Sequence, residues 1–302
     1  MRNISKEMSH TLDERIGSKM KCKFLMLFVV AALAALLCAP STGLADLTLG
    51  SAQSFAVLGA STVTNTHSTT IYGNLGVSPG SAITGFGPGT VTGGSIHGPG
   101  VVSDPAQSDA LHAYNTLKAL TSPDANSLTG HVLGSAGYDR LTPGVYKFDS
   151  SAQLTGALTL DFASNPDADF IFQIGTALTT ASSSVVNVIH GGPLSGVYWL
   201  MGVTGGSGTG SATLGTNTMF AGNILALDSI TLVTGAEILG RAIALHAAVT
   251  MDTNTINNNT QDFGSYGFSG GSTTPVPIPP TVWLLGSGLV GLAGFRKRFK
   301  KA

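Results

Sequence analysis

Residues 223–253, NILALDSITLVTGAEILGRAIALHAAVTMDT, decide the fold because they contain two similar segments. Residues 223–227 align with residues 242–246, Ile230-Thr231 aligns with Val249-Thr250, and Thr234 aligns with Thr253, each at an offset of 19 residues. A fixed period near 20 residues with alternating apolar positions is the signature of a stacked solenoid. Each coil then buries its apolar side with its neighbours, and an outward Thr lies over an outward Thr.

Similar patterns run through residues 46–262, which we take as the folded core. Short runs of four to six residues alternate apolar side chains with Thr or Ser and are interrupted by Gly, Asn or Pro, as in residues 55–58, 145–148, 158–160, 170–174 and 197–200. Such runs are typical of strands separated by turns. The predicted class is therefore mainly β.

One segment of the core has helical spacing instead. Asp104 is the predicted N-cap, Pro105 stands at the first helical position, and Gln107 stands at the third. The apolar residues that follow recur at helical spacing and form one face: Ala106, Ala110, Ala113, Tyr114, Leu117 and Leu120. We expect a helix over residues 104–120 that packs this face on the strands.

The composition excludes several classes of function. Charged residues are 10% of the chain, against roughly 25% in ordinary globular proteins. Residues 46–275 hold four basic and thirteen acidic residues, a balance of −9, so there is no basic patch for nucleic acid. The only cysteines, Cys22 and Cys38, precede this core, which therefore has neither a disulfide nor a thiolate metal site.

The beginning of the chain reads as an export signal. The basic residues Lys19, Lys21 and Lys23 precede an apolar run over residues 24–39, and a small-residue site follows at residues 43–45. This order predicts a secretory signal that signal peptidase cuts after Ala45. Residues 1–19 resemble an upstream extension, with Met20 as the true start. The alternative is an N-terminal anchor helix.

The end of the chain resembles the PEP-CTERM sorting signal of Gram-negative bacteria. After a linker over residues 263–280, the tail at 281–302 contains an apolar stretch, residues 282–295, whose fourteen residues would rise about 21 Å as a helix. The resemblance rests on three parts: Val276, Pro277 and Pro279; the run WLLGSG at 283–288; and Arg296, Lys297 and Arg298. It implies a transient membrane anchor cut by an exosortase, although Ile278 stands where the family has Glu. The alternative is a permanent transmembrane anchor.

No pattern in the core predicts a catalytic, metal or cofactor site. The seven His residues lack the short spacing of a zinc site, and Asp167 and Asp169 lie in an Asn-Pro context that favours a turn. The Gly-rich residues 205–210 are not followed by Lys-Ser/Thr, so they predict a turn between coils and not a phosphate loop. Four scattered basic residues cannot easily supply a glycan-active site, and we expect no enzyme.

Several ordered sequence blocks together resemble the microbial family of ice-binding adhesin domains. They are FAVLGASTVTNT at 55–66, GNLGVSPG at 73–80, GTVTGG at 89–94, LTPGVY at 141–146, SAQLTG at 151–156, FIFQI at 170–174, FAGNILA at 220–226 and GRA at 240–242. The resemblance covers about residues 48–258. It implies a right-handed, discontinuous β-solenoid of triangular section with one long helix alongside. In that fold the N-terminal coil lies near the C-terminal coils.

The resemblance also implies that one flat Thr-rich face contacts ice, often through Thr-Ala/Gly-x-Thr/Asn motifs. Residues 180–183 are close to this motif, residues 234–237 place Glu237 in it, and residues 253–256 depart from it. The candidate ice-binding residues are Thr64, Thr66, Thr180, Ser182, Thr216, Thr218, Thr231, Thr234, Thr250, Thr253 and Thr255. The alternative is a structural or adhesive matrix protein that uses the same fold to bind extracellular polysaccharide.

Overall fold

The computed structural model describes residues 49–192, 195–204 and 210–258. The chain divides into two units, Met1–Asp46 and Leu47–Ala302, and every described residue belongs to the second. The predicted export signal, linker, sorting tail and most of the Gly-rich segment lie outside the described residues. Within the described part, helices are too short or too polar to cross a bilayer.

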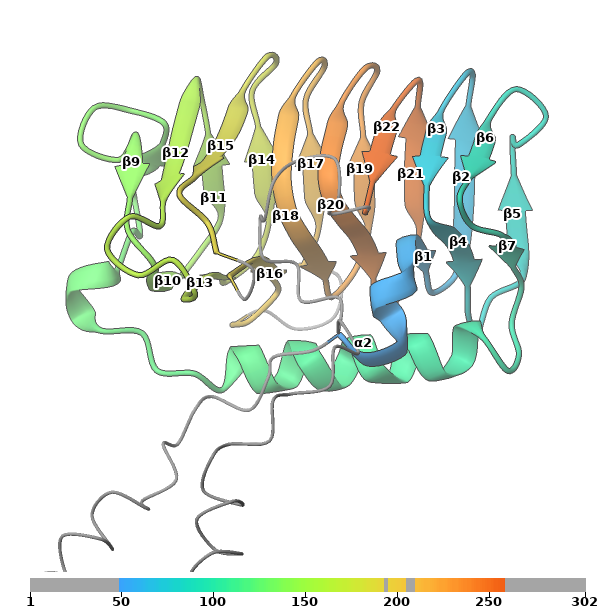
Figure 1. Cartoon of the computed structure of the whole chain (residues 1–302), viewed down its shortest axis with the longest axis horizontal. Coiled ribbons are helices and arrows are strands. Elements are labelled where there is room, and N and C mark those ends of the chain that lie inside the picture. Colours follow the sequence, from blue (N-terminus) through green and yellow to red (C-terminus); the bar gives the residue numbers. More distant parts are fainter. Residues whose placement is uncertain (1–48, 193–194, 205–209, 259–302) are drawn as a thin grey trace, which may run out of the picture. The chain divides into compact units, whose positions relative to one another are not determined.

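The described residues form a solenoid of parallel strands with three faces, which confirms the mainly β prediction (Figure 1). The first face, which we call the threonine face, is an eight-stranded sheet. Its strands, in spatial order, are β5 (Ala82–Thr84), β2 (Thr62–Thr66), β21 (Val249–Asp252), β19 (Ile230–Leu232), β17 (Ala212–Leu214), β14 (Leu178–Thr180), β11 (Ala152–Leu154) and β8 (Val132–Leu133).

The second face, the helix face, carries the long helix. Its strands in spatial order are β7 (Ile96–His97), β4 (Asn74–Val77), β1 (Phe55–Gly59), β20 (Glu237–Ala244), β18 (Met219–Ala226), β16 (Gly196–Met201), β13 (Asp169–Ile174) and β10 (Gly144–Phe148).

The third face shares β18 and β20 with the helix face, because these two strands run through the corner between them. Its other strands are β6 (Thr90–Thr92), β3 (Thr70–Tyr72), β22 (Thr255–Asn257), β15 (Val185–Ile189), β12 (Ala157–Asp161) and β9 (Arg140–Leu141). Gly222 and Gly240 make the bend, with φ of 122° and 139°. A Cβ on Gly240 would lie 2.2 Å from the carbonyl oxygen of Gly222, so only Gly allows the two corners to stack.

The spatial order of the coils differs from their order in the chain. β1 pairs with β20, and β2 pairs with β21, so the N-terminal coils extend the stack beyond the C-terminal ones. This arrangement confirms the discontinuous solenoid that the family resemblance implied. It also brings Thr64 beside Thr250, although 186 positions separate them in the sequence.

The predicted 19-residue repeat is confirmed on one face and corrected on another. Thr231 pairs with Thr250 at the predicted offset of 19. On the helix face, however, Ile224 pairs with Ala242 and Leu225 with Ile243, an offset of 18. The corner that follows β20 contains one residue more than the corner that follows β18, which restores the offset of 19 on the threonine face. A one-residue slip would exchange inward and outward side chains, so packing determines the shorter offset there.

The helix α2 (Ser103–Lys118) runs along the stack and covers the helix face, as predicted (Figure 1). Five of its six predicted apolar residues are buried, and Leu120 packs partly buried beside them. The predicted cap is wrong: Val102 is the N-cap, and the Asp104 carboxylate accepts hydrogen bonds from the Gly100 N–H and the Ser78 hydroxyl. Two 3-10 helices, η1 (Gly50–Ser54) and η2 (Asp124–Asn126), complete the described elements.

The interior of the solenoid is filled by inward side chains that stack from coil to coil. Phe172 and Trp199 stack with ring centroids 3.9 Å apart, and Tyr146 and Phe220 flank them. Because each inward residue lies over its register partner, the core is a set of continuous columns. The three outer faces therefore have a fixed backbone spacing along the stack.

Candidate functional site

The threonine face carries one unbroken row of outward Thr side chains. Each member pairs in register with the next, and we call the row the threonine ladder: Thr179, Thr213, Thr231, Thr250, Thr64 and Thr84. Neighbouring strands lie about 4.8 Å apart, so the six rungs span about 24 Å. Gln153 occupies the next position beyond Thr179.

The side chains beside the ladder keep the face flat. The residue two positions before each ladder Thr points to the same side of its strand, and in every coil it is small: Ala177, Ser211, Ser229, Ala248, Thr62 and Ala82. The hydroxyl oxygens of Ser211 and Ser229 lie 3.1 Å apart, so this second row is also in register. The face thus offers a two-dimensional array of methyl and hydroxyl groups at the strand spacing.

The face is almost free of charge. Across its eight strands, Asp252 is the single charged residue, and it stands at the end of β21. Its carboxylate accepts from the hydroxyls of Thr234 at 2.6 Å and Thr253 at 3.0 Å, and it lies 2.9 Å from the His67 ring. The Thr234 hydrogen bond is the main reason that the pKa of Asp252 is lowered. All three partners lie in corners of the solenoid, so the Asp252 carboxylate makes these contacts at the edge of the face.

The structure brings only part of the predicted set together on this ladder. Thr64, Thr231 and Thr250 are rungs, and Thr66 is exposed at the end of β2 beside Asp252. The remaining exposed or half-exposed candidates on this side lie in the corner after the threonine face: Ser182, Thr216, Thr234 and Thr253. Glu237, which interrupted the predicted motif, lies on the third face and leaves the ladder intact.

Three predicted residues have other positions. Thr180 is 3% exposed and Thr218 is 0% exposed, so neither can contact ice. Their hydroxyls bond to each other at 2.8 Å inside the corner, because Thr180 follows the outward Thr179 and therefore points inward. Thr255 lies on the third face, where it pairs with Thr70.

Three rungs are not among the residues predicted from the sequence: Thr84, Thr179 and Thr213. The signal that identifies them is alternation, because each stands next to an apolar residue that points inward, namely Ile83, Leu178 and Leu214. The predicted Thr-Ala/Gly-x-Thr/Asn segments instead fall on the corner between the threonine face and the third face. Their spacing therefore marks the turn and not the ladder.

A second carboxylate cluster, around Asp161, lies away from the ladder. On the third face the Asp161 carboxylate contacts His190 Nδ1 at 2.7 Å and accepts from Arg140, and these hydrogen bonds hold its pKa well below the ordinary range. Asp167 lies in a turn, as predicted, whereas Asp169, which the same context assigned to a turn, begins strand β13. Among the described residues, no group of three His, Cys, Asp or Glu side chains is placed to hold a metal ion.

Comparisons with known proteins identify relatives over nearly the whole described solenoid. The family model described as ice-binding-like matches residues 57–257. An ice-binding protein of Nostoc sp. strain HG1 is 49% identical over 84% of this chain and 88% of its own length. An ice-binding protein of Flavobacterium frigoris strain PS1 is 30% identical over 69% of this chain and 75% of its own length.

Solved structures show the same architecture. The structure of an ice-binding protein from an Antarctic biological consortium superposes with a TM-score of 0.62 at 38% identity and covers 72% of this chain and 93% of its own. That of an ice-binding protein from the Antarctic ascomycete Antarctomyces psychrotrophicus gives 0.60 at 34% identity, covering 71% of this chain and 98% of its own.

Proposed function

Because the chain belongs to the ice-binding-like family, we propose that it binds ice and that the threonine ladder is the contact surface. The observation that carries the proposal is the uninterrupted run of six Thr rungs on a face that is flat and nearly uncharged. The hydroxyl of each rung can hold a water molecule at a fixed position. The methyl group beside it disfavours disordered hydration, so the face can order water into a lattice-like layer.

The first test is ice recrystallisation inhibition by the purified chain. The variant Thr231→Tyr/Thr250→Tyr places two large rings in the middle of the ladder, and we expect it to lose most of the inhibition while remaining folded. Thr92→Tyr is the matched control, since Thr92 is an exposed strand Thr on the third face. Equal inhibition by the ladder variant and the wild type would reject the ladder as the ice surface.

The same assay separates ice binding from the alternative function. If the folded wild type fails to inhibit recrystallisation or to shape ice crystals, the ice-binding proposal fails. The chain would then be a structural or adhesive matrix protein that uses this fold, and extracellular polysaccharide would be its candidate partner.

We further propose that the protein is exported and held at the cell surface. The support is the sequence alone: an export signal at residues 1–45 and a PEP-CTERM-like tail with Val276, Pro277 and Pro279 before an apolar stretch and Arg296, Lys297 and Arg298 after it. Signal peptidase and an exosortase are the expected processing enzymes. Mass spectrometry of the mature protein tests both cuts, and an intact tail in the membrane fraction would show a permanent anchor.

A further inference from the structure

The third face opens between β15 and β18. β15 pairs with β12 at five positions, but with β18 it pairs only at Val185 and Met219. Beyond that pair the strands separate, because β18 bends into the helix face at Gly222 while β15 continues into the connection to β16. The Trp199 indole N–H donates to the Ala221 carbonyl at 3.0 Å. This carbonyl, on the open side of β18, therefore has a side-chain donor in place of a strand partner.

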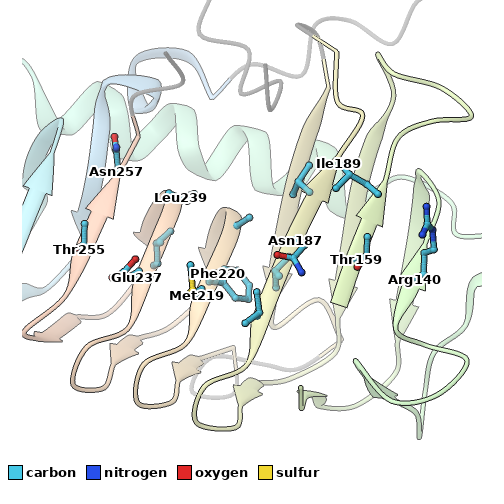
Figure 2. Close-up of a pocket in the computed structure, with 15 residues that line it drawn as sticks. Arg140, Thr159, Asn187, Ile189, Met219, Phe220, Glu237, Leu239, Thr255 and Asn257 are labelled. Carbon is cyan, nitrogen blue, oxygen red and sulfur yellow. The ribbon is translucent and has the colours of Figure 1, made fainter. Parts of the chain in front are cut away.

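The separated strands β15 and β18 form the floor of a cavity of about 570 Å³ on the third face (Figure 2). Its apolar part consists of Ile189, Met219 and Leu239 around the inward residues Val186 and Phe220. Met219 is 54% exposed, which is unusual for a large apolar side chain in the middle of a sheet. The lining is mainly apolar, and its polar members are Arg140, Thr159, Asn187, Glu237, Thr255 and Asn257. The size and the mainly apolar lining are those of a binding pocket.

The chain leaves the described structure at the rim of this cavity. Thr255 and Asn257 of the last strand, β22, both line it. The register places Asn257 level with Leu239 and Ala221, which is the end where β15 and β18 have separated. The opening is about 10–15 Å from β22, two to three strand spacings. Five extended residues span about 17 Å, so residues 259–263 suffice to reach it.

The sequence that follows suits an apolar cavity. Residues 259–275 contain Phe263, Tyr266 and Phe268, and Asp262 is their only charged residue. We propose that residues 263–268 dock in the cavity of the third face and place aromatic side chains against Ile189, Met219 and Leu239. Docking here covers the apolar floor and keeps the connection to the C-terminal tail away from the threonine face.

Disulfide trapping in the full chain tests this placement. Cys22 and Cys38 are the only native cysteines, so the background Cys22→Ser/Cys38→Ser is free of thiols. We expect Met219→Cys with Phe263→Cys to form an intramolecular disulfide under mild oxidation. The matched control, Thr179→Cys with Phe263→Cys, uses an exposed residue of the threonine face and should remain reduced. Equal trapping in both pairs, trapping in neither, or a disulfide between two copies would overturn the proposal.

Hydrogen exchange gives a second readout that does not depend on engineered thiols. In Phe263→Ala/Tyr266→Ala/Phe268→Ala, amides of residues 186–189 and 220–221 should exchange faster by a factor of about 5 to 30, because the docked side chains no longer protect them. Strands β11 and β14 of the threonine face should be unchanged. Ser265→Ala/Ser269→Ala is the control variant, and unaltered exchange in the triple variant would contradict docking.

Discussion

At the scale of single residues, the hydroxyls of Thr218 and Thr231 have different roles. The Thr218 hydroxyl contacts Thr180 and donates to the Ala181 carbonyl, all within the buried corner. Thr218→Val leaves the Thr180 hydroxyl without this partner, and we expect the free energy of unfolding to fall by about 1–3 kcal/mol with ice activity retained. Thr231→Val removes a surface hydroxyl and should change stability by less than about 0.5 kcal/mol.

Chemical denaturation of both variants, alongside recrystallisation assays, checks this contrast. Greater destabilisation by Thr231→Val than by Thr218→Val would contradict the assignment of Thr218 to the interior.

The contrast between these two residues also shows which information composition lacks. Thr179 and Thr180 are adjacent and chemically identical, and only the inward direction of Leu178 decides which of them is a rung. Strand alternation contained that information, whereas the family-like motif at residues 180–183 pointed to the wrong Thr.

At the scale of elements, α2 stabilises the solenoid through its buried face. Tyr114 is 1% exposed, and its hydroxyl donates to the Met201 carbonyl at 3.1 Å. We expect Tyr114→Ala to lower the free energy of unfolding by about 3–5 kcal/mol, since it leaves a cavity between helix and sheet. Tyr114→Phe should cost only about 1 kcal/mol, because the Met201 carbonyl still accepts from the Leu227 N–H.

Thermal unfolding followed by circular dichroism measures both changes. If Tyr114→Phe were as damaging as Tyr114→Ala, the hydrogen bond and not the packing would hold the helix.

The helix could be predicted from the strong helical spacing of its apolar residues, but its N-cap could not be predicted. Asp104 has the chemistry of an N-cap, yet a tertiary contact with Ser78 and a turn at Gly100 engage its carboxylate. A contact between residues so far apart in the sequence has no local signal.

At the scale of the whole molecule, the ladder exists because coils from both ends of the described chain meet. Thr64 and Thr84 come from the N-terminal coils, and Thr250 and Thr231 come from the C-terminal ones. The period near 19 residues predicted the stacking of two neighbouring coils. It could not predict that β2 follows β21, since this junction depends on packing between distant segments. The sequence therefore indicates the kind of surface, and the topology determines its length.

The acid stability of the whole molecule follows from its carboxylates. Asp104, Asp109, Asp149, Asp161 and Asp252 all have a folded-state pKa below the ordinary value, chiefly because hydroxyl, imidazole, ammonium or guanidinium groups donate to them. A lowered pKa means that the folded state binds protons less readily than the unfolded state. The stabilisation is therefore complete above about pH 5 and is lost as the pH falls toward the folded-state values.

We expect the melting temperature to be nearly constant from pH 7 to about pH 5 and to fall steadily below about pH 4. Asp161→Asn should lower the melting temperature at neutral pH, because Arg140 and His190 lose their charged partner, and should make the acid dependence shallower. Calorimetry from pH 7 to pH 2.5 measures both effects. A melting temperature that rises on acidification would show that relief of the core's net negative charge outweighs these paired carboxylates.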